Sequence, residues 1–161
     1  MLGLQPRLVE AIGAPVRLES PSRQAAVRGR RLRAWLIDRR LRIEGAPAQL
    51  AHGLSEVQAP WLEYTAPPEG SPQVIGEFLA AGPGWMRMTP NADQPDRTYE
   101  ARWKDVGEGA NAVYLARDQR GQPLLTMTGR PEFAATGFGK LRADRLAVQI
   151  REVPADGRDG P

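Results

Sequence analysis

The stretch Val57-Gln58-Ala59-Pro60-Trp61-Leu62-Glu63-Tyr64 decides how the chain is expected to fold. Its apolar residues occupy odd positions up to Ala59 and even positions from Leu62 onward. Alternation with a period of two is typical of a half-buried strand. A change of phase within the strand indicates one extra residue, as in a β-bulge or a corner. Because a proline is tolerated where no N–H group is needed, we predict a strand that bends at Pro60.

The same pattern, in the form apolar-x-small-x-x-Leu-x-apolar, occurs again at residues 27–34 and at residues 141–148. The residues that precede two of the copies, 41–47 and 125–131, also match each other. With an offset of 84, seven of the 24 positions from Leu41 to Tyr64 are identical in the later copy, whereas average composition gives about two. Gly13-Ala14-Pro15 precedes the first copy in the same way. The sequence therefore predicts a β repeat protein with units of irregular length.

Length and composition favour one domain of short strands. A chain of 161 residues suits a single domain with an adequate core. The 17 glycines and 15 prolines favour many strands joined by turns over long helices. No cysteine is present, which excludes disulfides, thiolate metal sites and thiol nucleophiles.

The spacing of apolar segments and turns predicts roughly ten to twelve strands, with turns every eight to twelve residues or so. We therefore expect an all-β fold: an open β-jelly-roll or β-roll of stacked antiparallel strands built from the irregular repeats. The expected organisation is an N-terminal lead-in segment at residues 1–12, a single β domain at 13–153 and a disordered tail at 154–161.

One competing interpretation concerns residues 24–43, which also fit a basic amphipathic helix. Such a helix would indicate a membrane surface or nucleic acid as partner. Gly29 weakens the helix, and Arg39 interrupts its apolar stripe. The similarity to the two other copies favours strands.

The net charge of the chain does not identify its partner. The net charge of +3 comes from arginine, because Lys104 and Lys140 are the only lysines. A basic surface suits anionic partners such as nucleic acid, phospholipid or a phosphorylated glycolipid, although a GC-rich genome would also favour arginine over lysine. No apolar run reaches the ~18 residues of a membrane span, and no signal peptide is visible. We hypothesise that the chain is part of a longer protein.

The sequence shows no recognisable arrangement of catalytic residues. His52 is the only histidine and is expected in a surface turn, so neither a histidine-rich metal site nor a serine triad is indicated. The segment 137–140 faintly resembles a phosphate-binding loop, but it fits a hairpin connection better. We therefore expect no enzyme, no cofactor and no metal.

Aromatic residues supply an alternative function. Aromatic and arginine side chains exposed on a sheet hold single-stranded nucleic acid in several modules. The aromatic residues recur about once per repeat unit, which also fits core or edge packing. We regard nucleic acid as an unlikely partner. The residues concerned are Trp35, Trp61, Trp85, Trp103, Tyr64, Tyr99 and Tyr114.

A family resemblance lies in the sequence from Leu125 through Gly129 and Pro131 to the copy at 141–148, and in its twin from Leu41 to Tyr64. These residues resemble the repeat of the OstA-like family, the periplasmic proteins of lipopolysaccharide transport. In that family one strand ends in a Gly turn, and the next carries a small-Asp pair before an apolar strand. Pro60 replaces the aspartate in one copy. The resemblance covers about residues 13–150, and the middle, 74–111, fits the repeat poorly.

The resemblance implies a V-shaped β-jelly-roll whose two sheets part enough to hold acyl chains, and whose members stack through edge strands. It implies a non-enzymatic domain of the periplasm or cell envelope that binds or bridges an amphipathic, lipopolysaccharide-like lipid. Arg142 and Arg145 are the candidates for contact with anionic headgroups. The alternatives are a dry core, a structural or interaction β domain of a larger envelope protein and, third, a basic nucleic-acid-binding domain. The candidates for the apolar groove are Leu41, Ile43, Val57, Leu62, Tyr64, Leu125, Met127, Leu141, Leu146 and Val148.

Overall fold

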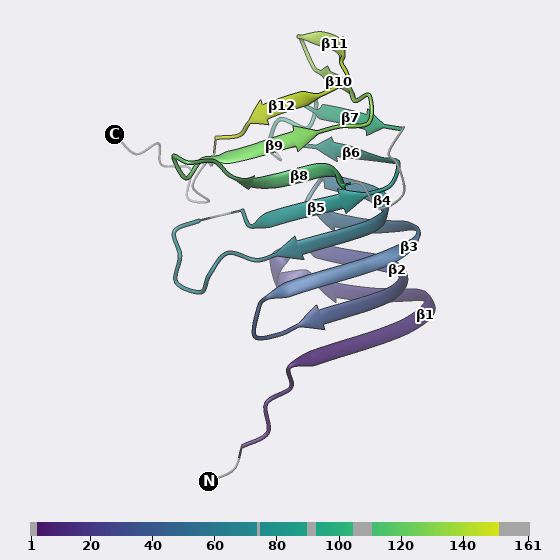
Figure 1. Cartoon of the computed structure of the whole chain (residues 1–161), viewed down its shortest axis with the longest axis vertical. Coiled ribbons are helices and arrows are strands. Elements are labelled where there is room, and N and C mark those ends of the chain that lie inside the picture. Colours follow the sequence, from purple (N-terminus) through teal and green to yellow (C-terminus); the bar gives the residue numbers. More distant parts are fainter. Residues whose placement is uncertain (1–2, 74, 90–92, 105–110, 152–161) are drawn as a thin grey trace.

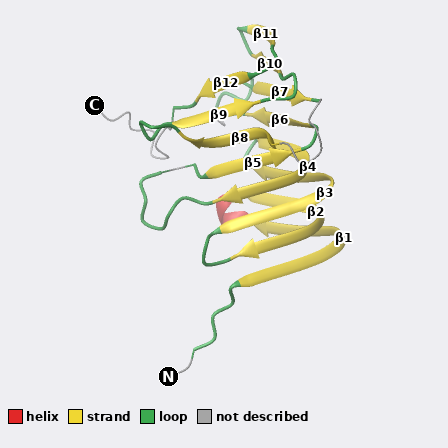
Figure 2. Ribbon diagram, in the orientation of Figure 1, coloured by secondary structure: helices red, strands yellow, loops and turns green. Residues whose placement is uncertain are grey.

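The computed structural model describes residues 3–73, 75–89, 93–104 and 111–151, and it confirms the all-β expectation. One 12-stranded antiparallel sheet accounts for the architecture, with a single 3-10 turn, η1 (Pro21–Arg23), and no α-helix among these residues (Figure 2). The strands are β1 (Leu8–Ser20), β2 (Ala25–Trp35), β3 (Arg40–His52), β4 (Ser55–Thr65), β5 (Glu77–Ala81), β6 (Gly84–Met88), β7 (Tyr99–Trp103), β8 (Asn111–Arg117), β9 (Pro123–Met127), β10 (Glu132–Ala135), β11 (Gly139–Arg142) and β12 (Leu146–Gln149).

The sheet is curled into two facing halves that meet at a corner, on the right in Figure 1. Its hydrogen-bonded order is β11-β10-β7-β6-β4-β5-β8-β9-β12, with β3, β2 and β1 added below β4. The strands β1 to β4 cross the corner and contribute a segment to each half. The front half holds residues 8–12, 31–35, 40–44 and 61–65 with β5, β8, β9 and β12. The rear half holds residues 16–20, 25–28, 48–52 and 55–59 with β6, β7, β10 and β11.

In the lower region, β1 to β4, the corner is a bulge within continuous strands. The triplet Gly13-Ala14-Pro15 of β1 lies opposite Arg30 of β2, and Gly45-Ala46-Pro47 of β3 lies opposite Pro60 of β4. Both triplets contain a cis proline peptide bond. The extra residues let the strand bend while pairing resumes on the far side. The bend predicted at Pro60, and the strands predicted for residues 24–43, are therefore confirmed.

In the upper region, β5 to β12, the strand ends at the corner and a new strand begins in the other half. The chain passes from β5 to β6 through Gly82 and Pro83, from β9 to β10 through residues 128–131, and from β11 to β12 through residues 143–145. The third copy of the pattern is therefore two strands instead of one. Even so, all three copies cross the corner in the same direction, from the rear half to the front half.

The internal repeat is also visible in the turns. Gly53 connects β3 to β4, and Gly137, 84 residues later, connects β10 to β11. Both glycines have positive φ, +58° and +80°, a conformation that favours glycine. The β3–β4 hairpin and the β10–β11 hairpin therefore occupy equivalent positions in the two copies of the repeat.

One expectation about organisation needs correction. Residues 8–12 are not a lead-in, because they form the first half of β1 and pair with residues 31–35 of β2. The middle of the chain, residues 74–111, which fits the sequence repeat poorly, supplies β5, β6 and β7, and these strands pair within both halves. Gly82 and Pro83 form the corner there, and the sequence around them lacks the pattern apolar-x-small-x-x-Leu-x-apolar. The predicted tail, 154–161, lies outside the described residues.

Candidate functional site

The apolar groove candidates lie on three rows of the inner face of the sheet. Cross-strand pairing defines a corner row and a mouth row in the front half, and one row in the rear half. The corner row is Ala11, Leu32, Ile43, Leu62, Ala80, Val113, Met127 and Leu146. The mouth row is Val9, Ala34, Leu41, Tyr64, Phe78, Leu115, Leu125 and Val148. The rear row is Leu18, Val27, Leu50, Val57, Met86, Ala101, Phe133 and Leu141.

All ten candidates therefore share the inner face, but their exposure differs. Those fully buried between the halves are Ile43, Val57, Leu62, Leu125 and Met127. Those half-buried against the same core are Leu41, Tyr64, Leu146 and Val148. Leu141 is 40% exposed because β11 lies at the edge of the sheet and, within the described residues, pairs with β10 alone. The inner face is thus a packed core at its centre and open only at its margins.

In the lower region exposure rises from the corner to the mouth. Along β3, Ile43 is 2% exposed whereas Leu41 is half-buried; along β4, Leu62 is 1% exposed whereas Tyr64 is half-buried. Leu50, on the facing rear half, is half-buried as well. The two halves are therefore closed at the corner and present a strip of apolar side chains at the mouth.

In the upper region most of the same mouth row is closed. Phe78, Leu115 and Leu125 are all exposed by 7% or less. Ile75, before β5, and Ile150, after β12, pack against the core beside these strands. The Ile150 N–H donates to the carbonyl of Pro123, which fixes that segment against β9. In the mouth row of the upper region Val148 is half-buried and the other three side chains are buried, so the lower region offers the larger apolar surface at the mouth.

The two headgroup candidates lie away from this mouth. Arg142 is at the corner end of β11 and its guanidinium bonds Glu132 at 3.0 Å. Hydrogen bonds from Lys140 and then Arg142 hold the pKa of Glu132 below its usual value. Arg145 is exposed in the bend between β11 and β12, at the corner. The sequence places both near apolar residues, but strand alternation and the corner separate them from the half-buried mouth row.

A cation that the sequence interpretation missed is Arg39. It lies in the turn between β2 and β3, at the mouth end of both strands, two residues before Leu41. Its Nε atom is buried and has no hydrogen-bond partner among the described residues. A buried guanidinium N–H without an acceptor is uncommon. The sequence feature that could have pointed to this residue is its position in the turn that joins two repeat strands.

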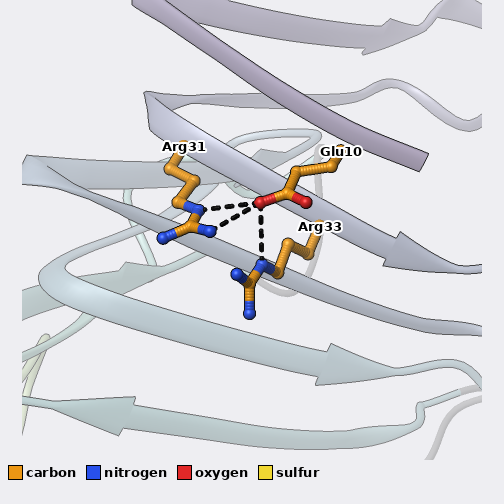
Figure 3. Close-up of polar contacts among 3 residues, drawn as sticks. All are labelled: Glu10, Arg31 and Arg33. Atoms are coloured by element: carbon orange, nitrogen blue, oxygen red, sulfur yellow. Dashed lines mark hydrogen bonds and ion pairs between the residues drawn. The ribbon is translucent and has the colours of Figure 1, made fainter. Parts of the chain in front are cut away.

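The outer face of the lower region is covered by arginine, glutamate and tryptophan. Glu10 accepts hydrogen bonds from Arg31 at 2.6 Å and from Arg33 at 3.2 Å (Figure 3), and these guanidinium groups lower the pKa of Glu10. Arg42 bonds Glu63 at 3.0 Å. Charged groups on this face are thus engaged with one another.

The tryptophans proposed for base stacking are engaged as well. Arg40 stacks 4.1 Å from the ring centroid of Trp35, and Arg42 lies 5.0 Å from that of Trp61. Arg87 covers Trp85 at 5.5 Å. Trp103 is 1% exposed, and its Nε1–H donates to the Gly82 carbonyl at 2.7 Å. The four tryptophans therefore pack or stack on arginine within the fold, whereas Tyr99 and Tyr114 are 39% and 45% exposed.

The residues considered for catalysis and for phosphate binding lie in or beside hairpin turns. His52 is exposed at the end of β3, and its cross-strand neighbour is Ser55. No group of three or more His, Asp or Glu side chains in the described ranges is arranged to hold a metal ion. The segment 137–140 forms the β10–β11 hairpin. In the described part of the chain, no helix has the length and apolarity that crossing a membrane requires.

Comparison with known proteins adds no relative: no family model, no curated protein and no solved structure matches the chain.

Proposed function

We propose that the protein is a non-enzymatic β-roll domain of the cell envelope that binds an amphipathic anionic lipid at the mouth of its lower region. The observation that carries the proposal is the graded inner face: buried at the corner and half-exposed along Leu41, Tyr64 and the facing Leu50. The resemblance of the repeats to the OstA-like family supports the same class of ligand.

Acyl chains fit this strip physically. Each CH₂ group moved from water into an apolar environment contributes about 0.8 kcal/mol. The corner row is already packed, so the chains are proposed to lie across the mouth instead of entering the core. A lipid phosphate at the same end of the strands would give the buried Nε of Arg39 an acceptor. Apolar burial would therefore supply affinity, and the arginine would select an anionic headgroup.

The test is lipid binding by the detergent-free, purified protein. Organic extraction followed by mass spectrometry should recover an acyl lipid, and a fluorescent acyl probe should bind saturably. Leu41→Gln should weaken probe binding several-fold, because it places a polar amide on the strip. Leu79→Gln is the matched control: Leu79 is also partly buried in the front half, but its cross-strand neighbours are Glu63 and Tyr114 on the outer face. Binding by this control should be unchanged.

Folded protein that carries no lipid and binds no acyl probe would overturn the proposal. That outcome would support the second candidate, a structural or interaction β domain without a small ligand. One observation favours that candidate: the centre of the interior is close-packed, with Leu62 and Leu125 each 1% exposed. Binding to single-stranded nucleic acid that falls steeply with salt would instead support the third alternative.

A further inference from the structure

The lower end of the molecule is a free strand edge. Among the described residues β1 pairs only with β2, so its other side is unpaired along 13 residues. A long edge with apolar side chains is a template for pairing with another chain. Four large apolar side chains of β1 are exposed: Leu8 by 50%, Val9 by 44%, Ile12 by 79% and Leu18 by 45%.

The two segments of β1 are complementary to each other. In residues 8–12 the inner-face side chains are Val9 and Ala11, and Glu10 lies between them on the outer face. In residues 16–20 the inner-face side chains are Val16 and Leu18, and Arg17 lies between them. An apolar-acidic-apolar segment thus precedes the corner, and an apolar-basic-apolar segment follows it.

We propose that β1 pairs antiparallel with β1 of a second copy of this chain, with Val9 opposite Leu18, Glu10 opposite Arg17 and Ala11 opposite Val16. A twofold axis through the corner relates the copies, so every contact occurs twice. The front half of each copy then continues into the rear half of the other. The apolar interiors join, and the two corner triplets face one another without pairing.

The charges select this register. Shifting the pairing by two residues in one direction keeps the inner faces aligned but places Glu10 opposite Glu19, and the shift in the other direction places Glu10 opposite Pro15 and Arg17 opposite Leu8, so the ion pair is lost. Like charges directly opposite each other destabilise a sheet. Arg17 is exposed, faces Arg28 within its own chain and makes no ion pair with the described residues, so a carboxylate from a second copy is its natural partner.

The charges also disfavour end-to-end stacking of β1 on the upper edge. In registers that match the inner faces and set Leu141 opposite Val16 or Leu18, Arg17 lies opposite Lys140 or Arg142. Both cations already share Glu132. The symmetric pair therefore has the better electrostatic match. This inference goes beyond the proposed function and does not depend on it, because it rests on the edge of β1 and not on the mouth.

Cysteine cross-linking tests the register on the full chain, which has no cysteine of its own. Directly opposed residues in an antiparallel pair have Cα atoms about 4.5–5.5 Å apart, within the range of a disulfide. Mixed Val9→Cys and Leu18→Cys proteins should form a disulfide-linked dimer under mild oxidation. Neither variant alone should, because each introduced cysteine and its symmetry mate would lie on opposite halves, and packed sheet faces are about 10 Å apart, beyond the reach of a disulfide.

A mixture of Val9→Cys and Val148→Cys is the test of end-to-end stacking. Cross-linking of that mixture, or of neither mixture, would overturn the proposal. Light scattering should show a dimer that Arg17→Glu dissociates, since the introduced carboxylate would then face Glu10 of the other copy at both symmetry-related positions. The control, Arg120→Glu, makes the same charge change in the β8–β9 turn and should leave the dimer intact. A monomeric parent protein at micromolar concentration would also contradict the inference, whatever the lipid experiment shows.

Discussion

The lower and upper regions build the same corner in two different ways. In β1 to β4 the strand continues through the corner, with a Gly-Ala-Pro bulge opposite a single residue. In β5 to β12 the strand stops, and the next one starts in the other half. The lower region keeps its mouth row half-exposed, whereas the upper region buries three of its four residues in that row and leaves only Val148 half-buried. Both regions therefore have the corner, but their mouth rows differ in solvent exposure.

The difference teaches that the repeat fixes the corner and leaves the mouth to the connecting segments. In the lower region neighbouring strands of the same half are joined at the mouth by short turns, such as residues 36–39 between β2 and β3 in the front half. In the upper region Ile75 and Ile150, which lie outside the strands, add apolar contacts to the core. The candidate site therefore belongs to the region in which the connections are shortest.

The largest expected loss of stability comes from a charge placed in the buried corner row. Leu62→Asp should lower the free energy of unfolding by several kcal/mol, because it buries an unpaired charge in the packed corner row. Tyr64→Asp, two residues along the same strand at the mouth, should cost clearly less. Denaturant unfolding of both variants measures the difference, and equal losses would mean that the mouth is as closed as the corner.

Two alanine substitutions in the mouth row test the difference in burial between the upper and lower regions. Leu125→Ala in the upper region should cost about 2–5 kcal/mol, since it removes a fully buried side chain. Leu41→Ala in the lower region should cost about 1 kcal/mol, because its side chain is already half in water. Thermal and urea unfolding should rank the two variants in this order. The reverse order would contradict the comparison.

Corner packing in the lower region is tested by Gly29→Ala. A Cβ atom at Gly29 would lie 2.6 Å from the Glu44 carbonyl oxygen and 2.6 Å from Cγ1 of Ile43. We expect a loss of about 1–3 kcal/mol, because backbone atoms must move to admit it. Arg30→Ala, the adjacent exposed residue, should change the unfolding free energy by no more than about 0.5 kcal/mol. If both variants behaved like the parent protein, the close approach at the corner would be refuted.

A smaller effect is expected from pH. The pKa of Glu10 at the lower end and that of Glu132 at the upper end are both lowered, by hydrogen bonds from arginine and from lysine with arginine, respectively. Their stabilising effect is present above the ordinary glutamate value of 4.5 and is lost as pH falls through the lowered values. Unfolding midpoints measured from pH 7 downward should therefore fall less steeply in Glu10→Gln and Glu132→Gln. An unchanged slope in both would rule out these contacts as a source of acid sensitivity.

The smallest effect is expected at His52. His52→Ala should alter the unfolding free energy by no more than about 0.5 kcal/mol and should leave lipid-probe binding unchanged, because the side chain is exposed at the end of β3. Calorimetry and the probe titration measure both. Loss of any activity in this variant would count against a non-enzymatic function.

Much of the fold was predictable because strand alternation is a local property. The phase change at Pro60 and the match between residues 41–64 and 125–148 were sufficient to predict bent, repeated strands. The strands of residues 77–103 were harder to place in the repeat, because Gly82 and Pro83 make the corner without the shared pattern. Arg39 was missed because the sequence shows its place in a turn, whereas the burial of its Nε atom depends on the tertiary structure.

The sequence by itself determined that the chain is all-β, where its strands bend and which side chains share the inner face, because a period of two assigns every residue to one side of a sheet. Only the tertiary structure decided how deeply each inner residue is buried. Leu41 and Leu125 have the same place in the repeat, yet one is half-exposed and the other is 1% exposed. That difference arises because burial depends on residues distant in sequence, such as Ile75 and Ile150, that pack beside one strand and not beside the other.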